Sequence, residues 1–470
     1  MKNILDLKIH KNYKMLIVLL FFLTVAIFYS KQKTISYPDV ILITVDALRA
    51  DHLSCYGYPR QTSPNIDNLA KLGVTFLNCF ATSSGTVQSS VGLLTGRYLQ
   101  TDKIGSDWNN ALDGKFTTLA EYLKHFGYYT IAVLTNGTYR RGRGFEQGFD
   151  YFHVNNITND KDAEKLTAMV VDLLNKNQGK KPLFIWAHYI EPHAPYYFRQ
   201  EYFKTFQGDR LYKDNDKILK LKPEDLDKGF WYKDWTSKGY IPPVVFHRDN
   251  YSLNYYIACY DTEILYVDYC IGNLLKNLNN DTVIILTADH GESLGEHNVY
   301  FSHGENIYDE VLHIPLIIKD NRCFKGGKLI KEVVSSIDIV PTILNRVNPF
   351  WYFLNKVKFD GIDLRTVILN KNVLRKYIYS YLHWLGISIR DVNKNIKYIL
   401  HKNGKEELYV LPDEDNNLIY DIKMSRIKQR LKKELMLWSR KYPIPSDINA
   451  YKRILDKDIE NNLKNLGYLH

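Results

Sequence analysis

The sequence has few cysteines and none of the closely spaced pairs that build disulfide scaffolds or zinc ribbons. Its 470 residues include five cysteines, and no two of them form a Cys-x-x-Cys pattern. A small disulfide-stapled fold and a cysteine-rich zinc site are therefore excluded. Cys259 and Cys270 fall in one predicted helix, roughly 16 Å apart and too far to bridge. Free, buried thiols are expected.

Repeats, low-complexity tracts and an extreme charge are also missing. Apolar residues make up 45% and charged residues 24% of the chain, as in ordinary globular proteins. This composition excludes disordered, coiled-coil, collagen-like and multi-span membrane proteins. Lys and Arg outnumber Asp and Glu by 62 to 52, which favours anionic partners. No nucleic-acid-binding motif is present, so nucleic acid is not an expected partner.

Long apolar runs are absent except at residues 15–29 (MLIVLLFFLTVAIFY). Fifteen helical residues span about 22 Å, less than the hydrocarbon core of roughly 30 Å, and the flanking lysines can close part of the gap by snorkelling. No small-x-small cleavage site follows the run. We predict a signal anchor, with a single-pass protein in the cell membrane and an extracellular catalytic domain. A cleaved signal peptide and a buried helix are the alternatives.

Strand and helix patterns alternate through the first two thirds of the chain. Buried-strand patterns occupy residues 39–46, 129–134, 183–188 and 282–287, and helical patterns occupy 65–73, 89–94, 117–126, 164–175 and 262–278. The alternation predicts an α/β fold with a mostly parallel central sheet and helices on both faces. Such sheets bind ligands beyond the carboxyl ends of their strands. Asp46 and Asp289 each follow a predicted strand at that end.

The predicted domain organisation has three parts. Residues 1–33 form a cytoplasmic N-terminus and anchor, 34–372 a catalytic domain, and 373–470 a small α+β subdomain with a short antiparallel sheet and a helix. Residues 200–250 are predicted to be a lid-like insertion. Its basic and aromatic residues either select an anionic glycan or lipid head group or are simply solvated (Lys204, Arg210, Lys213, Lys217, Lys220, Trp231 and Trp235).

Four separated segments carry residues suited to chemistry. They are residues 46–58 (DALRADHLSCYGY), 86–97 (TVQSSVGLLTGR), 188–196 (HYIEPHAPY) and 289–303 (DHGESLGEHNVYFSH). Carboxylates with one or two imidazoles suit a divalent metal ion, with Asp46, Asp289 and His290 as candidate ligands. Thr86 would lie at a helix N-terminus, where amide groups and the helix dipole favour a tetrahedral oxyanion.

These segments suggest roles in ester cleavage. A metal-bound hydroxyl loses its proton readily, which makes Thr86 a candidate metal ligand and nucleophile. His193 and His303 could bind or protonate the leaving oxygen, and His188 and Arg97 are predicted substrate contacts. Each residue also has a structural explanation, such as a helix cap, a core imidazole or a local ion pair. Their joint occurrence favours a site.

With these motifs in place, the chain resembles the sulfatase family of the alkaline phosphatase superfamily. Residues 45–84 (VDALRADHLSCYGYPRQTSPNIDNLAKLGVTFLNCFATSS) match its opening block, and EPHAPY, ADHGESLGEH, SSIDIVPTIL and FDGIDL follow in order. The resemblance covers residues 38–440. It implies an α/β domain with one metal site, Asp46, Asp289 and His290 as ligands, and a small antiparallel C-terminal subdomain. It also places His193 and His303 at or near substrate-contacting positions.

The departures from the family pattern concern the nucleophile. Sulfatases carry Cys or Ser, oxidised to formylglycine, where this chain has Thr86. Gln88 and Ser90 replace the proline and arginine of the motif, and Ala47 replaces a second metal aspartate of many members. Threonine has a methyl group on Cβ and cannot give the aldehyde, so no formylglycine is expected. A threonine nucleophile resembles instead the superfamily's lipoteichoic acid synthases and phosphoethanolamine transferases.

Three hypotheses follow. The first is a metal-dependent enzyme that cleaves or transfers a phosphate-type ester through Thr86. The second is a sulfate ester hydrolase that works without formylglycine. The third, motivated by Gln88 and Ser90, is an inactive surface-anchored binding protein. One divalent ion is expected (Mn, Zn, Mg or Ca), and the histidine ligand favours Mn or Zn over Ca. An anionic ester, on a glycan or a lipid head group, is the expected substrate.

Overall fold

The computed structural model describes residues 37–98, 111–155, 163–206, 249–355, 357–369 and 375–443, with short pieces at 209, 211, 216–220, 239–242 and 245–247. By its contacts the chain divides into Met1–Pro38 and a large unit, Asp39–His470. The predicted anchor at residues 15–29 lies outside the described residues. Among the helices that are described, none has the length and apolarity to cross a membrane.

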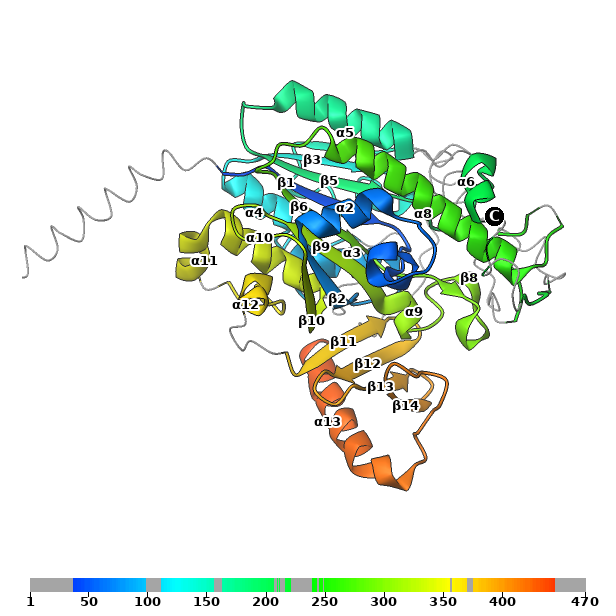
Figure 1. Ribbon diagram of the computed structural model, residues 1–470. Coiled ribbons are helices and arrows are strands. Elements are labelled where there is room, and N and C mark those ends of the chain that lie inside the picture. The colour runs from blue at the N-terminus through cyan, green and yellow to red at the C-terminus, as the bar shows by residue number, and fades with distance from the viewer. Residues whose placement is uncertain are drawn as a thin grey trace, which may run out of the picture. The chain divides into compact units, whose positions relative to one another are not determined.

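The large unit is built around an eight-stranded sheet (Figure 1). Its strands are β1 (Val40–Val45), β2 (Val74–Phe80), β3 (Tyr129–Leu134), β4 (Tyr151–Val154), β5 (Leu183–Tyr189), β6 (Val283–Ala288), β9 (His313–Lys319) and β10 (Lys328–Ser335). They lie in the order β10-β2-β9-β6-β1-β5-β3-β4. β1 is fully buried and runs parallel to β5 and β6, whereas β9 is antiparallel to both neighbours. The predicted mostly parallel sheet is confirmed.

Helices cover both faces of this sheet, as also predicted (Figure 1). One layer holds α2 (Pro64–Leu72), α5 (Ala163–Asn177) and α8 (Leu253–Leu275), and the other holds α3 (Thr86–Thr95), α4 (Leu119–His125) and α10 (Ile339–Val347). Shorter helices are α6 (Gln200–Phe206), α9 (Asp309–Leu312), α11 (Pro349–Asn355) and α12 (Leu364–Ile368). Local signals start two of them. Thr118 and Glu121 form a capping box at α4, and the Ser252 hydroxyl accepts from the backbone at the start of α8.

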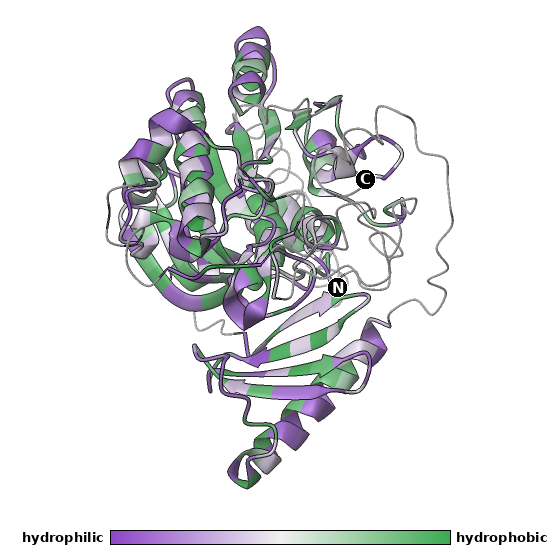
Figure 2. Ribbon diagram, turned by 90° about the vertical axis from the view of Figure 1, so that its right-hand side faces the viewer, coloured by the Kyte–Doolittle hydropathy of each residue, from purple (hydrophilic) through white to green (hydrophobic). Residues whose placement is uncertain are grey.

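The C-terminal region forms a second, antiparallel sheet. Its strands lie in chain order as β11 (Tyr377–Leu382), β12 (Gly386–Asp391), β13 (Ile396–His401) and β14 (Glu406–Val410), beside helix α13 (Ser425–Lys441). Hydrophobic and hydrophilic residues alternate along these elements (Figure 2). Leu431, Leu435 and Trp438 bury one face of α13 against the sheet. The small antiparallel sheet and its helix are confirmed. The boundary at residue 373 stays a prediction, as does the whole division into domains.

Two short strands near the sheet's carboxyl edge complete the described elements. They are β7 (Ser293–Leu294) and β8 (Tyr300–Ser302), which pair with each other. Turns of 3₁₀ helix lie at Ala50–His52, Ser54–Tyr56, Gly137–Tyr139, Glu296–Asn298, Ser336–Asp338 and Ile422–Met424.

Several strands were not predicted from the sequence. They are β2, β4, β7, β8, β9, β10 and β12. β9 is an interior strand that contains Pro315, a residue without the N–H that a ladder needs, so its sequence gives a weak strand signal. Of the predicted insertion, α6 and the short pieces are described. Arg210, Lys213, Trp231 and Trp235 lie outside the described residues, and the lid stays a prediction.

The cysteines are free, as expected, but they are not all buried. Cys79, Cys259 and Cys270 are buried in the core, whereas Cys55 is half-buried and Cys323 is exposed. Cys55 and Cys323 therefore correct the expectation of burial, and Cys323 lies on a surface turn after the end of β9.

Candidate active site

A pair of buried aspartates occupies the carboxyl edge of the central sheet. Val45 is paired with Ala288 in the parallel ladder between β1 and β6. The next residues, Asp46 and Asp289, therefore leave their strands at the same level, and each is at most 1% exposed. Asp46 Oδ1 and Asp289 Oδ2 have no hydrogen-bond partner in the described structure. Buried polar atoms are normally paired, so these two oxygens indicate a place for a ligand.

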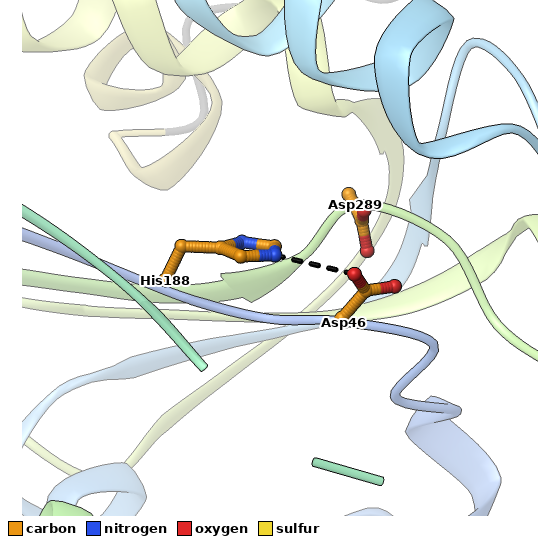
Figure 3. Close-up of side chains that lie close together, drawn as sticks. All are labelled: Asp46, His188 and Asp289. Atoms are coloured by element: carbon orange, nitrogen blue, oxygen red, sulfur yellow. Dashed lines mark hydrogen bonds and ion pairs between the residues drawn. The ribbon is translucent and has the colours of Figure 1, made fainter. Parts of the chain in front are cut away.

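The other oxygen of Asp46 is held by two donors from neighbouring strand ends. Asn136 Nδ2 donates to Oδ2 at 2.6 Å, and His188 Nε2 lies 3.2 Å from it (Figure 3). Thr44 Oγ1 accepts from Trp186 Nε1 at 2.9 Å and lies 2.8 Å from His188 Nδ1. Because Asp46 is ionised and can only accept, we assign the His188 proton to Nε2, and the Thr44 hydroxyl then donates to Nδ1. His188 orients Asp46, a role different from the predicted substrate contact.

His290 faces both unpaired carboxylate oxygens. Its Nδ1 donates to the carbonyl oxygen of Gly291 at 2.8 Å, so the lone pair lies on Nε2. Nε2 is 3.5 Å from Asp46 Oδ1 and 3.6 Å from Asp289 Oδ2. It is also 3.0 Å from Thr86 Oγ1, whose hydroxyl donates to it. These four residues, Asp46, Thr86, Asp289 and His290, are hereafter called the catalytic cluster.

The donor atoms of the catalytic cluster fit a divalent cation. Asp46, His188 and Asp289 offer ligand atoms within 4.8 Å of one another (Figure 3). Because Nε2 of His188 donates its proton to Asp46, we assign the imidazole position to His290, whose lone pair points at the carboxylates. Two carboxylate oxygens and one imidazole nitrogen suit Mn²⁺ or Zn²⁺. The structure therefore brings the predicted ligands together.

The protonation of the cluster is uneven. Burial opposes ionisation of Asp46, but His193 nearby and the hydrogen bond from His188 hold its pKa well below the usual range. Burial and the negative charge of Asp46 raise the pKa of Asp289 well above its usual value. Burial and the charge of His303 lower the pKa of His290 to about 3, so this ring is neutral near pH 7. A neutral imidazole is the form that accepts a proton or binds a metal.

Thr86 is the first residue of α3 and is 5% exposed. Gly85 is the N-cap and has no side chain of its own to bond the amides at the helix start, although the carboxamide oxygen of Gln88 lies against it, 2.5 Å from where a Cβ would be. The Ser89 hydroxyl donates to the carbonyl oxygen of Asp289 and fastens the first turn of α3 to the end of β6. The predicted helix N-terminus is confirmed. Its dipole and amides favour negative charge beside the Thr86 hydroxyl.

Two further histidines line the cluster. The ring centroid of His303 is 4.2 Å from that of His290 and 4.7 Å from that of His193. His303 Nδ1 lies 2.9 Å from Glu292 Oε1. Burial lowers the pKa of His303, but the charge and hydrogen bond of Glu292 outweigh burial and raise it. His303 is therefore the ring best suited to donate a proton from Nε2, and His193 borders it. The predicted role of both rings at the leaving oxygen stays a prediction.

Arg97 is not brought to the cluster. It follows the last turn of α3, whereas Thr86 is the first residue of that helix, and ten helical residues span about 15 Å. Its charge lies near Tyr122 and Tyr442 instead. The structure does not support Arg97 as a substrate contact. The motif fixed only its spacing from Thr86, and a helix of this length carries it to the other end.

The residues that depart from the family pattern have local partners. Ala47 donates its backbone N–H to Asp289 Oδ1 at 3.3 Å and supplies no carboxylate. Ser90, at the arginine position, lies 2.7 Å from the hydroxyl of Tyr139, and that ring packs against His188. Arg49 and Asp51, near the end of β1, form an ion pair at 2.8 Å.

Asn136 and Glu292 belong to the site but were not predicted in these roles. Asn136 follows β3 at the carboxyl edge of the sheet, and this position could have indicated it. In the sequence it is the asparagine of an Asn-x-Thr motif. With 0% exposure and a hydrogen bond to Asp46, it is not available for glycosylation. Glu292 is likewise 0% exposed, and it follows His290 by two residues in the chain.

The chain is similar to known proteins over most of its length. The sulfatase family profile matches residues 38–348. An uncharacterised sulfatase of Escherichia coli is 25% identical over 460 residues, covering 85% of this chain and 86% of that protein. An arylsulfatase of Clostridium perfringens is also 25% identical, with 84% and 92% covered.

Solved structures share the fold. A protein in complex with its substrate D-glucosamine-2-N,6-O-disulfate has a TM-score of 0.69 at 20% identity, over 88% of this chain and 100% of that one. A phosphonate monoester hydrolase of Agrobacterium radiobacter has a TM-score of 0.67 at 19% identity, over 86% and 96%.

The fold, the paired carboxylates and these likenesses define an ester-cleaving hydrolase with the alkaline phosphatase-like architecture. Since the profile spans well over half of its residues, the chain belongs to the sulfatase family. The predicted family, fold class and hydrolase activity are thereby confirmed.

Proposed function

We propose that this chain cleaves or transfers a phosphate-type ester, with Thr86 Oγ1 as the nucleophile. One observation carries the proposal: the Thr86 hydroxyl lies at the N-terminus of α3, 3.0 Å from His290 Nε2 and beside two buried aspartates with unpaired oxygens. A secondary alcohol cannot be oxidised to formylglycine. It can form a phosphoester that water or an acceptor alcohol then opens by attack at phosphorus.

The residues divide the work as follows. The amides at the start of α3 hold the anionic ester oxygens. The Thr86 hydroxyl faces His290 Nε2, its nearest proton acceptor, and His303 donates a proton to the leaving oxygen. A divalent ion held by Asp46, Asp289 and His290 would supply Lewis-acid chemistry. Accepting a proton and facing a cation are alternative roles of His290 Nε2.

Sulfate ester hydrolysis is the second candidate, because the two relatives matched by sequence are named sulfatases. One of the similar structures holds a sulfated glucosamine. A sulfate ester presents the same tetrahedral anion to the helix N-terminus. In both cases the proposed substrate is an anionic ester on a glycan or a lipid head group.

A matched panel tests the proposal. The purified full chain is assayed with Mn²⁺ and with Zn²⁺ against a sulfate ester, a phosphomonoester and a phosphodiester of one leaving alcohol. We expect turnover of a phosphate-type ester, a loss of about a thousandfold or more in Thr86→Ala, and partial activity in Thr86→Ser. Mass spectrometry of the quenched wild-type reaction should show a phosphate on Thr86.

Thr95→Ala is the matched control, because this buried threonine lies at the other end of α3 and donates to the carbonyl oxygen of Val91. It should keep wild-type turnover. Release of sulfate without release of phosphate would favour the second candidate. Unchanged turnover in Thr86→Ala would rule out the nucleophile.

The location of the protein is also a proposal. The apolar run at residues 15–29 and its flanking lysines support a single membrane anchor with the catalytic domain outside the cell. Protease treatment of intact cells should digest the catalytic domain, and alkaline extraction should leave the full chain in the membrane fraction. Release of the full chain by alkali would exclude the anchor.

A further inference from the structure

One aromatic side chain stands exposed beside the catalytic cluster. Trp384 is 52% exposed, and it is the only tryptophan among the exposed large apolar residues of the described chain. It lies in the three-residue turn between β11 and β12, where its neighbour His383 is 1% exposed. An exposed indole offers a flat, electron-rich apolar face to a ligand.

The ring of Trp384 is held in a fixed orientation. Its Nε1 donates to the carbonyl oxygen of Gly304 at 2.8 Å. A Cβ at Gly304 would lie 3.5 Å from Cζ2 of Trp384, so the six-membered part of the indole is within van der Waals distance of this loop. Gly304 follows His303, the proposed proton donor. The exposed ring is therefore attached to the loop that carries a residue of the site.

The turn that carries Trp384 also packs against the nucleophile loop. Leu382 Cδ1 would lie 3.6 Å from a Cβ at Gly85, the residue before Thr86. Tyr381 donates its backbone N–H to Thr82 O, in the loop before Thr86, at 2.9 Å. The same loop is bonded to the segment that follows His303, because the Ser84 hydroxyl donates to Asn306 O at 2.6 Å. The hairpin thus touches both loops that border the site.

We infer that Trp384 is a stacking platform for a pyranose ring whose ester group enters the catalytic cluster. This inference rests on the proposed function. Of the two carriers proposed for the ester group, a glycan and a lipid head group, it selects the glycan. A pyranose offers a flat face of C–H groups, which the negative face of an indole attracts. A small acyclic head group offers no such face. Trp384 is thus a specificity-determining residue outside the reacting atoms.

The test compares two pairs of esters in the full chain. Glucosamine 6-phosphate and glucosamine 6-sulfate carry a pyranose, whereas 2-aminoethyl phosphate and 2-aminoethyl sulfate carry the same charged groups without a ring. In Trp384→Ala we expect KM for the glucosamine esters to rise about tenfold, with kcat within twofold. The KM of the 2-aminoethyl esters should not change. Trp384→Phe keeps a ring and should fall between wild type and Trp384→Ala.

Tyr420→Ala serves as the matched control. Its side chain is 93% exposed, after the end of β14, so it removes an exposed aromatic ring elsewhere. We expect wild-type KM values for both ester classes. Equal changes for both classes in Trp384→Ala, or no change for either, would overturn the inference while leaving the proposed function standing.

A binding measurement separates this inference from the proposed function. Calorimetric titration of Thr86→Ala with the glucosamine esters needs no turnover, and adding Trp384→Ala should weaken binding about tenfold. If wild type turns over no ester, the proposed function fails and this titration still decides the role of Trp384. Equal affinity with and without the indole would reject the stacking platform.

Discussion

Two buried clusters of charge in the described structure differ in how their acids are compensated. In the catalytic cluster, Asp46 and Asp289 face each other across a neutral imidazole, and each keeps an oxygen without a partner. The second cluster lies where the small sheet meets the large one, and we call it the junction cluster (Asp309, Arg390, Lys397 and Glu414). There Lys397 Nζ lies 2.9 Å from Asp309 and 2.8 Å from Glu414.

The junction cluster is a structural arrangement of charges, whereas the catalytic cluster is arranged for a ligand. Every acid of the junction cluster contacts a cation, since Arg390 also pairs with Asp309. Buried charges that are paired in this way hold segments together, and removing one partner is costly. In the catalytic cluster no cation among the described residues contacts Asp289, and burial together with the negative charge of Asp46 raises its pKa. Burial and the charge of Asp309 also raise the pKa of Glu414 in the junction cluster, to about 7, but there the charge of Lys397 opposes them. A fold accepts such an arrangement where a ligand supplies the missing positive charge.

The largest expected effect follows from removing a charge of the catalytic cluster. Asp289→Asn should lower kcat/KM by at least about a thousandfold, because a ligand oxygen of the cluster is lost. Without metal, the free energy of unfolding should stay the same or rise, since the repulsion with Asp46 is relieved. Thermal unfolding and turnover of one preparation measure both quantities.

Metal addition sharpens this prediction. With free Mn²⁺ or Zn²⁺ at a hundred times Kd, wild type should gain about 2.7 kcal/mol and Asp289→Asn much less. Asp39→Asn is the control. Asp39 precedes β1, at the end of that strand opposite to Asp46, and it accepts a hydrogen bond from Leu183 N. It should keep both turnover and the metal response. A clear loss of stability in metal-free Asp289→Asn would contradict the comparison.

The junction cluster should respond in the opposite sense. Lys397→Met leaves Asp309 and Glu414 without their shared cation, and it should cost about 3–5 kcal/mol of unfolding free energy. Turnover per folded molecule should not change. Denaturant unfolding followed by an assay below the transition measures both. Lys432→Met removes an exposed ion pair with Glu406 and should cost less than about 1 kcal/mol. Similar losses in the two variants would show that the junction pairs contribute little.

A pH dependence tests the edge of the junction cluster. Burial lowers the pKa of His297, but the hydrogen bond and charge of Glu310 outweigh it and raise the pKa from 6.5 to about 9. A raised histidine pKa stabilises the fold fully below pH 6.5, and this contribution is lost as the pH rises through 9. We expect about 1 kcal/mol, because water screens the partly exposed ring.

Comparing wild type with His297→Gln isolates this contribution from other titrating groups. At pH 6 the free energy of unfolding of His297→Gln should be lower than that of wild type by that amount. At pH 9.5 the two proteins should have the same free energy of unfolding. A constant difference across the range would mean that His297 stabilises the fold without its charge.

Some residues of the catalytic cluster could be predicted from the sequence, and other residues of the site could not. Asp46, Asp289 and Thr86 were predictable because each follows a strand or begins a helix, and the rule on strand ends brings such positions together. The central parallel sheet was predictable from its continuous apolar strands. Asn136 and Glu292 were not, because each is a single polar residue whose role depends on which distant atom it meets.

The junction cluster lay beyond sequence reasoning for a related reason. Asp309 comes from α9 and its partners from β12, β13 and the turn after β14, and the docking of the small sheet decides their pairing. Two of the neighbouring strands, β9 and β12, had escaped prediction. For Arg97 the motif gave the correct spacing in the sequence, but the helix between Thr86 and Arg97 keeps the two residues apart in space.

The smallest expected effect concerns Ser90, which stands where the family has arginine. Its hydroxyl lies 2.7 Å from the Tyr139 hydroxyl, and Tyr139 packs on His188, which orients Asp46. If Ser90 has only this structural role, Ser90→Ala should cost about 1 kcal/mol of stability and leave kcat unchanged. Tyr139→Phe removes the same hydrogen bond from the other side and should match it, and the double variant should cost no more than either alone. A fall of kcat by tenfold or more in Ser90→Ala, with stability unchanged, would place this hydroxyl among the groups that contact the substrate. The arginine position would then still serve the reaction with a smaller side chain.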